Sequence, residues 1–205
     1  MWKLPDVVII GNAPIGKDFT ELVNAASFVV RFNEAGNYNR NCGTRTDALC
    51  VTNLCDPGRR FAKTRIVKTL PFISQTHEIW FPRTSDYYPL QYWFKPLGRD
   101  AFRRANYARH IVSRNQLQDK KVVSFSTELY QAACRDLHLP ADRLDGQVPS
   151  SGYLAVHYAL ERFPAPEFKV VLLGFSFQGL GPHCWAREKE RVEGLQKAGS
   201  LEWVN

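Results

Sequence analysis

The hydrophobic positions of the chain fall in short runs separated by longer mixed segments. Compact apolar runs rich in β-branched residues predict buried strands at 7–10, 28–32, 47–52, 78–81, 122–125 and 168–173. Segments that mix apolar and charged positions predict helices at 18–26, near 99–110, at 151–162 and at 184–198. This alternation is typical of an α/β, Rossmann-like fold with a mainly parallel central sheet flanked by helices.

Length and composition limit the class of protein. The chain has 205 residues, of which 44% are hydrophobic, as expected for one globular domain spanning 1–205. No run approaches the roughly 18 apolar residues of a membrane span. The first strand begins so early that we expect no signal peptide. The five cysteines are scattered and odd in number, which favours reduced thiols in a cytoplasmic protein.

Positive charge and aromatic side chains gather in the middle of the chain. We predict an irregular aromatic and basic insertion at about 82–115. The net charge of +7 is concentrated in two clusters, one at 59–68 and one at 95–114. Such clusters attract phosphates, nucleic acid or anionic lipid surfaces, although a solvated basic face has the same composition.

The first strand runs into a glycine turn, in the stretch VVIIGNAPIG at 7–16. A dinucleotide fingerprint requires glycine at the third position of this turn, where Ala13 stands. Asn12 follows the first strand and Asn33 follows the second, so the two amides are expected near one another at the carboxyl edge of the sheet. Each could hold a ribose, a phosphate oxygen or a base edge, or could be a simple turn residue.

Two later segments carry further candidate chemistry. Ser150 and Ser151 precede a helix, where hydroxyls and free N–H groups suit a phosphate or carboxylate but equally suit ordinary capping. His157 lies within that helix and is interpreted as a packed residue. His183 lies at the start of the last helix, where a neutral imidazole can act as a base, or can be a surface residue without a catalytic role.

Taken in order, these segments resemble the animal-type sialyltransferases, family 29 of the glycosyltransferases. The large motif of that family is matched by VVIIGNAPIG, FVVRFNEAG and CGTRTDA. The small motif is matched by PSSGYLAVHYAL with VVLLGFSF, and the very short motif H-x-x-x-x-E by His183 and Glu188. The matched segments cover about half of the chain.

The resemblance implies a reaction and a set of roles. It implies an inverting transfer of sialic acid, or of a related ulosonic acid, from a cytidine monophosphate (CMP) donor to a glycan or lipid-linked glycan. His183 would be the general base, and Glu188 would support it. The binding residues implied for the donor are Asn12, Ala13 and Asn33 for the nucleotide, Ser150, Ser151 and Gly152 for the phosphate or carboxylate, and Gly174 and Phe175 for the cytosine. No cofactor and no divalent metal are expected, and the sequence contains no Asp-x-Asp motif.

The chain also departs from the family. The cysteines that join the large and small motifs in animal members are missing, which fits a bacterial, cytoplasmic member of the family. Phe175-Ser176-Phe177-Gln178 occupies the place of the third motif without its histidine. The donor could equally be CMP-Kdo, which has the same nucleotide and carboxylate.

Two other classes of function stay open. One is a non-catalytic protein that binds a nucleotide or nucleic acid. The other is an NAD-dependent oxidoreductase in which Glu34 holds a ribose. For the transferase we expect no nucleic-acid partner, and a peripheral contact with the anionic inner membrane through residues 92–114 is one interpretation of the basic insertion.

Overall fold

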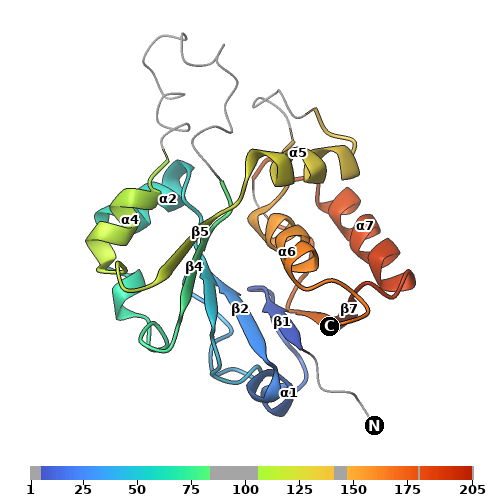
Figure 1. Ribbon diagram of the computed structural model, residues 1–205, viewed down its shortest axis with the longest axis horizontal. Helices are drawn as coiled ribbons and strands as arrows, with labels where there is room; N and C mark the ends of the chain where they lie inside the picture. The colour runs from blue at the N-terminus through green and yellow to red at the C-terminus, as the bar shows by residue number, and fades with distance from the viewer. Residues whose placement is uncertain (1–5, 84–105, 141–146, 180, 205) are drawn as a thin grey trace.

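The computed structural model describes residues 6–83, 106–140, 147–179 and 181–204. Seven strands form one sheet in the order β5-β4-β3-β2-β1-β6-β7, and every neighbouring pair is parallel (Figure 1). The strands are β1 (Val7–Ile10), β2 (Phe28–Phe32), β3 (Ala48–Cys50), β4 (Glu78–Phe81), β5 (Lys121–Ser124), β6 (Val170–Leu173) and β7 (Glu202–Val204).

Helices cover both faces of the sheet. They are α1 (Thr20–Ala25), α2 (Cys55–Lys63), the 3₁₀ turn η1 (Val67–Thr69), α4 (Ala108–Asn115), α5 (Thr127–Asp136), α6 (Ser151–Arg162) and α7 (Trp185–Lys197). Helices α5, α6 and α7 pack on one face, and α1, α2 and α4 pack on the other (Figure 1). The fold is therefore a three-layer α/β sandwich.

The strand sequences explain this layering. Successive side chains of a strand point to opposite faces, so a strand covered on both sides must be apolar throughout. In β1, Ile9 joins the cluster under α6 and Ile10 joins the cluster under α1, and both are completely buried. All four residues of β1 and of β6 are buried in this way.

The α/β fold with a parallel sheet is confirmed, and the sheet is parallel throughout. The strands predicted at 28–32 and 78–81 and the helix at 151–162 have the predicted bounds. The strands predicted at 47–52 and 168–173 are shorter, and β5 begins and ends one residue before the predicted 122–125.

Several elements were not predicted. The prediction passed over α2, η1, α5 and β7. Residues 84–105 of the predicted insertion, with most of the helix predicted near 99–110, lie outside the described part of the chain. Helix α4 (Ala108–Asn115) overlaps the end of that predicted helix and continues beyond it.

The structure also bears on membrane topology. Within the described ranges, no helix combines the length and the apolar character needed to cross a bilayer.

Candidate functional site

A cavity of about 400 Å³ lies at the carboxyl ends of β1, β2 and β6. Strand order reverses between β1 and β6, because the chain builds the sheet outward to β5 and then returns to the far side of β1. Parallel α/β sheets bind ligands at such a switch point, since the loops on its two sides diverge. The cavity volume is in the range of small-molecule sites. Its walls are formed by Gly11, Asn12, Ala13, Phe32, Asn33, Thr52, Ser150, Ser151, Gly152, Gly174, Phe175, Ser176, Phe177, Gln178, His183, Trp185 and Glu188.

The nine residues that the resemblance assigns to the base or to donor binding all line this cavity, and so does Glu188. They come from segments more than 170 residues apart in the chain, so the fold gathers them rather than the sequence. Their individual roles stay predictions. Phe32, Thr52, Ser176, Phe177, Gln178 and Trp185 also line the cavity and were not predicted.

The glycine turn after β1 is joined to the turn after β6. A side chain at Gly11 would begin 2.3 Å from the carbonyl oxygen of Gly174, which no side chain tolerates. The N–H of Gly11 donates to Leu173 at 2.8 Å, and that of Ala13 donates to Gly174 at 3.0 Å. Glycine at position 11 is thus required by backbone packing, and the lack of a glycine at position 13 does not damage the turn.

Asn37 holds this turn from behind. Its Nδ2 group donates to the carbonyl oxygens of Gly11 at 2.8 Å and Ala13 at 2.7 Å. Buried Arg31 fixes the loop that carries Asn37, since its guanidinium donates to the carbonyls of Cys42 and Gly43. Sequence reasoning missed Asn37. The segment 33–41 contains four asparagines and the glycine turn contains a fifth, and no local feature distinguishes Asn37 from the others.

The amide of Asn12 is bonded to the protein through both of its polar atoms, since its Nδ2 group donates to the carbonyl oxygen of Phe32 at 3.5 Å, whereas Asn33 is bonded through its oxygen. The Oδ1 atom of Asn12 accepts from the N–H of Gly36 at 3.1 Å, and that of Asn33 accepts from the N–H of Thr52 at 3.0 Å. No bond from the Nδ2 group of Asn33 to another described residue is found. This group is therefore a donor available to a ligand in the cavity.

The start of α6 forms the opposite wall. Ser150 caps the helix by accepting from the N–H of Tyr153 at 3.0 Å. The N–H groups of Ser151 and Gly152 belong to the first turn, whose donors have no partners within the helix. They face a cavity with the positive end of the helix dipole behind them, which suits a phosphate or a carboxylate.

Glu188 fixes Ser150 from inside the protein. It is completely buried, and its two oxygens accept from the N–H and the hydroxyl of Ser150, both at 2.7 Å. Burial raises the pKa of Glu188, although the Ser150 bonds and nearby Arg83 oppose the shift. Ser150 can therefore reach a ligand only by giving up one of these bonds, whereas Ser151 and Gly152 have no such commitment.

His183 lines the cavity and is held by a hydrogen bond to the backbone. Its Nδ1 atom lies 3.1 Å from the carbonyl oxygen of Val148, so Nδ1 carries the proton and Nε2 keeps a lone pair. Burial lowers the pKa of His183 below its ordinary value of 6.5, and the positive charge of Arg83 adds to this, whereas the bond to Val148 acts in the opposite direction. The imidazole is therefore neutral at pH 7 and able to take a proton.

Other candidates from the sequence lie elsewhere. His157 packs at the α5–α6 contact, 3.3 Å from Asp136, as interpreted from its helix position. Glu34, which the oxidoreductase alternative requires, forms a two-pronged ion pair with Arg60 and does not line the cavity. The described residues contain no group of three or more His, Cys, Asp or Glu arranged to hold a metal ion.

The fold is that of the sialyltransferases. A crystal structure of a mammalian sialyltransferase superposes with a TM-score of 0.60 at 14% sequence identity, covering 98% of this chain and 68% of the other. A second mammalian sialyltransferase structure, in complex with Gal-β-1-3GalNAc-ortho-nitrophenol, gives a TM-score of 0.58 at 14% identity, covering 97% of this chain and 68% of the other. At this identity the likeness establishes the fold alone.

In sequence, the chain is similar to the urease operon 23 kDa accessory protein of Rhizobium meliloti (strain 1021). The two are 26% identical over 208 residues, which cover 95% of this chain and 90% of the relative. No protein-family model matches the chain. The particular reaction is therefore a matter for inference from the site.

Proposed function

We propose that this protein is an inverting glycosyltransferase that moves sialic acid, or a related ulosonic acid, from a CMP-activated donor to a hydroxyl of a glycan acceptor. One observation carries the proposal. At the switch point of a sialyltransferase-like fold, a neutral histidine with an unused base nitrogen shares a cavity with the open N-terminus of α6.

The chemistry asked of these residues is modest. The acceptor hydroxyl gives its proton to Nε2 of His183, and its oxygen forms a bond to the anomeric carbon of the donor. The bond from that carbon to the phosphate oxygen breaks, and CMP leaves with the electron pair. The proton passes from His183 to solvent after product release. A positioned base of this kind contributes about 10²–10⁴ in rate.

Donor binding is assigned to the two walls. Asn12, Ala13 and the free amide of Asn33 would meet the nucleotide, and Gly174 with Phe175 would line the cytosine pocket. The N–H groups at the start of α6 would meet the phosphate or the donor carboxylate. We propose that neither a cofactor nor a divalent metal takes part, because the helix terminus supplies positive potential where the leaving phosphate gains charge.

The test compares nucleotides and then donors. CMP should raise the melting temperature of the protein, whereas AMP, UMP and NADH should not. Transfer should then be seen with CMP-sialic acid or with CMP-Kdo. Both donors have to be tested side by side, because the residues of the site do not distinguish one sugar from the other.

A pair of histidine variants assigns the base. His183→Ala should lower transfer by at least about a hundredfold while CMP affinity changes little. The matched control is His110→Ala, which removes an exposed imidazole from α4 and should change neither quantity. Equal loss of transfer and of CMP affinity in His183→Ala would make His183 a binding residue instead.

The relative from the urease operon favours a second candidate, an accessory role beside urease. The similarity covers nearly the whole of both chains, so the two proteins share one architecture. This candidate predicts that the protein is retained by immobilised urease subunits and that CMP neither binds nor affects the retention. CMP binding together with sugar transfer would exclude it as the main activity.

A further inference from the structure

A strongly basic face lies on the side of the molecule away from α7. Helices α2 and α4 pack side by side through a shared apolar cluster that includes Phe61 and Ile111. Asn115 of α4 joins them, because its side chain donates to Phe61 at 3.0 Å and accepts from Lys68 at 3.2 Å. The two basic clusters of the sequence, remote from one another in the chain, therefore contribute to one face.

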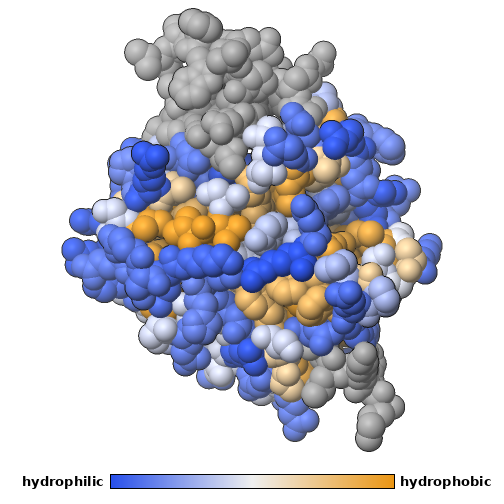
Figure 2. Space-filling model, in the orientation of Figure 1, coloured by the Kyte–Doolittle hydropathy of each residue, from blue (hydrophilic) through white to orange (hydrophobic). Residues whose placement is uncertain are grey.

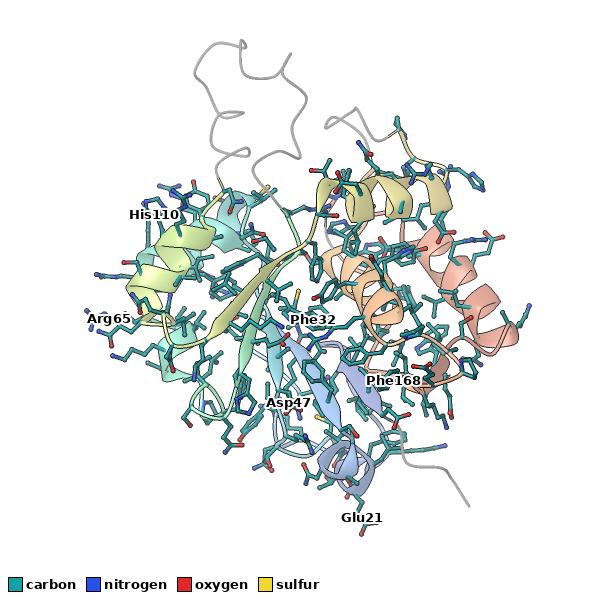
Figure 3. The ribbon with its side chains drawn as sticks, in the orientation of Figure 1. Glu21, Phe32, Asp47, Arg65, His110 and Phe168 are labelled. Atoms are coloured by element: carbon teal, nitrogen blue, oxygen red, sulfur yellow. The ribbon has the colours of Figure 1, made fainter. Side chains whose placement is uncertain are left out.

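Positive charge exceeds negative charge on this face. The segments 55–69 and 108–115 contain seven lysines and arginines against one aspartate. The charge of Arg60 is balanced by its ion pair with Glu34. We therefore define the basic face by the residues Arg59, Lys63, Arg65, Lys68, Arg109, His110 and Arg114. All but Arg59 are exposed, and Figure 3 shows Arg65 and His110 pointing outward on the same side.

Part of this charge works against helix stability. Arg109 occupies the first turn of α4, at the positive end of its dipole, and that turn has no acidic residue. A cation at this end repels the helix dipole. Stability of α4 therefore does not account for the presence of Arg109, which favours a role in contacts outside the chain.

An apolar groove borders the basic face. It has a volume of about 790 Å³ and runs between α4 and the edge strand β5. Val112 and Val122 give it an apolar surface above the buried ring of Phe81, and Arg109 belongs both to its lining and to the basic face. The side chain of Val122 is 45% exposed, and Figure 2 shows an apolar area over α4 and β5 beside the hydrophilic surface of α2 and α4.

We propose that the basic face and this groove together dock the protein on an anionic lipid bilayer, with headgroup phosphates at the arginines and lysines and apolar lipid in the groove. A cationic strip beside an exposed apolar hollow matches the charge and the layering of such a surface. Nucleic acid fits less well, because single strands bind by stacking on exposed aromatic rings, and among the described residues that line the groove the one aromatic residue, Phe81, is fully buried.

The inference does not depend on the transferase activity, so a binding assay tests it separately. The full chain is sedimented with vesicles of phosphatidylcholine, with or without phosphatidylglycerol. Binding is expected only to the anionic vesicles, and it should be lost at high salt. Equal binding to neutral vesicles, or binding that resists salt, would overturn the proposal.

Two variants of equal net charge locate the surface. Arg65→Glu with Arg114→Glu reverses two charges on the basic face and should weaken vesicle binding by at least about tenfold. Arg135→Glu with Lys197→Glu reverses two exposed charges on α5 and α7 and should leave it within about twofold. Equal loss in both variants would show attraction by net charge alone and would contradict a defined face.

The groove is tested with Val122 and Phe168, the two large apolar side chains that are exposed among the described residues. Val122→Asn should weaken vesicle binding severalfold, whereas Phe168→Asn, outside the groove, should not. Melting temperatures identify any variant that fails to fold. If Val122→Asn instead abolishes self-association seen by analytical ultracentrifugation, the groove binds a second copy of the chain. If an oligonucleotide displaces the protein from the vesicles and binds it more tightly than the vesicles do, the basic face is a nucleic-acid-binding surface. Either result overturns the lipid assignment.

Discussion

His183 and Glu188 belong to one short motif, yet their surroundings give them opposite properties. His183 faces the cavity and is held neutral, with its proton on Nδ1. Glu188, one turn further along, is completely buried, and both of its carboxylate oxygens accept hydrogen bonds from Ser150. The motif therefore joins a residue suited to chemistry with one suited to positioning the start of α6.

The pH dependence of transfer should report on His183. Because the pKa of its imidazole is lowered, the base is neutral at pH 7, and activity should fall only when the pH drops below about 6.5. A profile of kcat/KM against pH measures this acidic limb. In His183→Gln the residual rate should lose the limb, and an unchanged limb in that variant would assign the titration to another group.

Glu188 allows a separate stability prediction. Glu188→Ala leaves the N–H and the hydroxyl of Ser150 buried without acceptors, which should cost about 2–4 kcal/mol of unfolding free energy. Glu188→Gln keeps an acceptor for the N–H and should cost less. Urea unfolding of both variants measures the difference, and equal stability of the two would show that the Ser150 bonds contribute little.

The pH dependence of that comparison follows from the raised pKa of Glu188. The native state holds this proton more tightly than the unfolded state, so the carboxyl costs stability as the pH rises above about 4.5. Glu188→Gln removes that cost. The free energy of unfolding of Glu188→Gln, relative to that of the parent protein, should therefore be highest near pH 7 and lowest near pH 4.

Sequence reasoning found the residues of the cavity but not the bonds between them. Turn chemistry and motif resemblance identify Asn12, Asn33 and His183 locally. The bond from Ser150 to Glu188 joins residues 38 apart, and Asn37 reaches back to a turn 24 residues earlier. Such contacts exist only once the sheet has formed, so no local pattern indicates them.

At the scale of elements, strands between two helix layers were the easiest to predict. Such strands are apolar on both sides, and a short run of β-branched and aliphatic residues such as VVLL in β6 is typical of a buried strand. The edge strand β5 is mostly exposed, so its pattern is weaker, and its predicted bounds were displaced by one residue.

The missed helix α2 contains Pro57 and Gly58, which are strong turn signals. Proline is tolerated in the first turn of a helix, where its missing N–H has no partner to lose. Gly58 is required for another reason, since a side chain there would begin 2.5 Å from the backbone of Asn53. A long-range contact therefore explains a residue that local reasoning interprets as a helix breaker.

This contact predicts opposite effects for two glycines in helices. Gly58→Ala should destabilise the protein by more than about 1 kcal/mol, because buried backbone would have to move. Gly194→Ala, in α7, meets nothing within 4 Å and should stabilise the protein by about 0.5–1 kcal/mol through helix propensity. Thermal or urea unfolding measures both. Destabilisation by Gly194→Ala would show that propensity is not the deciding effect in α7.

At the scale of the whole molecule, charge and cavity are separated. The basic face lies on α2, η1 and α4, whereas the cavity lies at the switch point between β1 and β6. Among the described residues that line the cavity there is no lysine or arginine. An anion in the cavity would be held by N–H groups, amides and the α6 dipole, and buried Arg83, which is not a lining residue, adds positive potential near His183 and Glu188.

This separation predicts different responses to salt at the two surfaces. Hydrogen bonds from fixed N–H groups in a partly enclosed cavity are screened little, so CMP affinity should change by less than about threefold between 50 and 500 mM salt. Binding to anionic vesicles depends on exposed charges within a Debye length and should be lost over the same range. Isothermal titration with CMP and vesicle sedimentation, run in identical buffers, measure both responses. A CMP affinity that falls as steeply as vesicle binding would place the nucleotide on the basic face and leave the cavity without its proposed ligand.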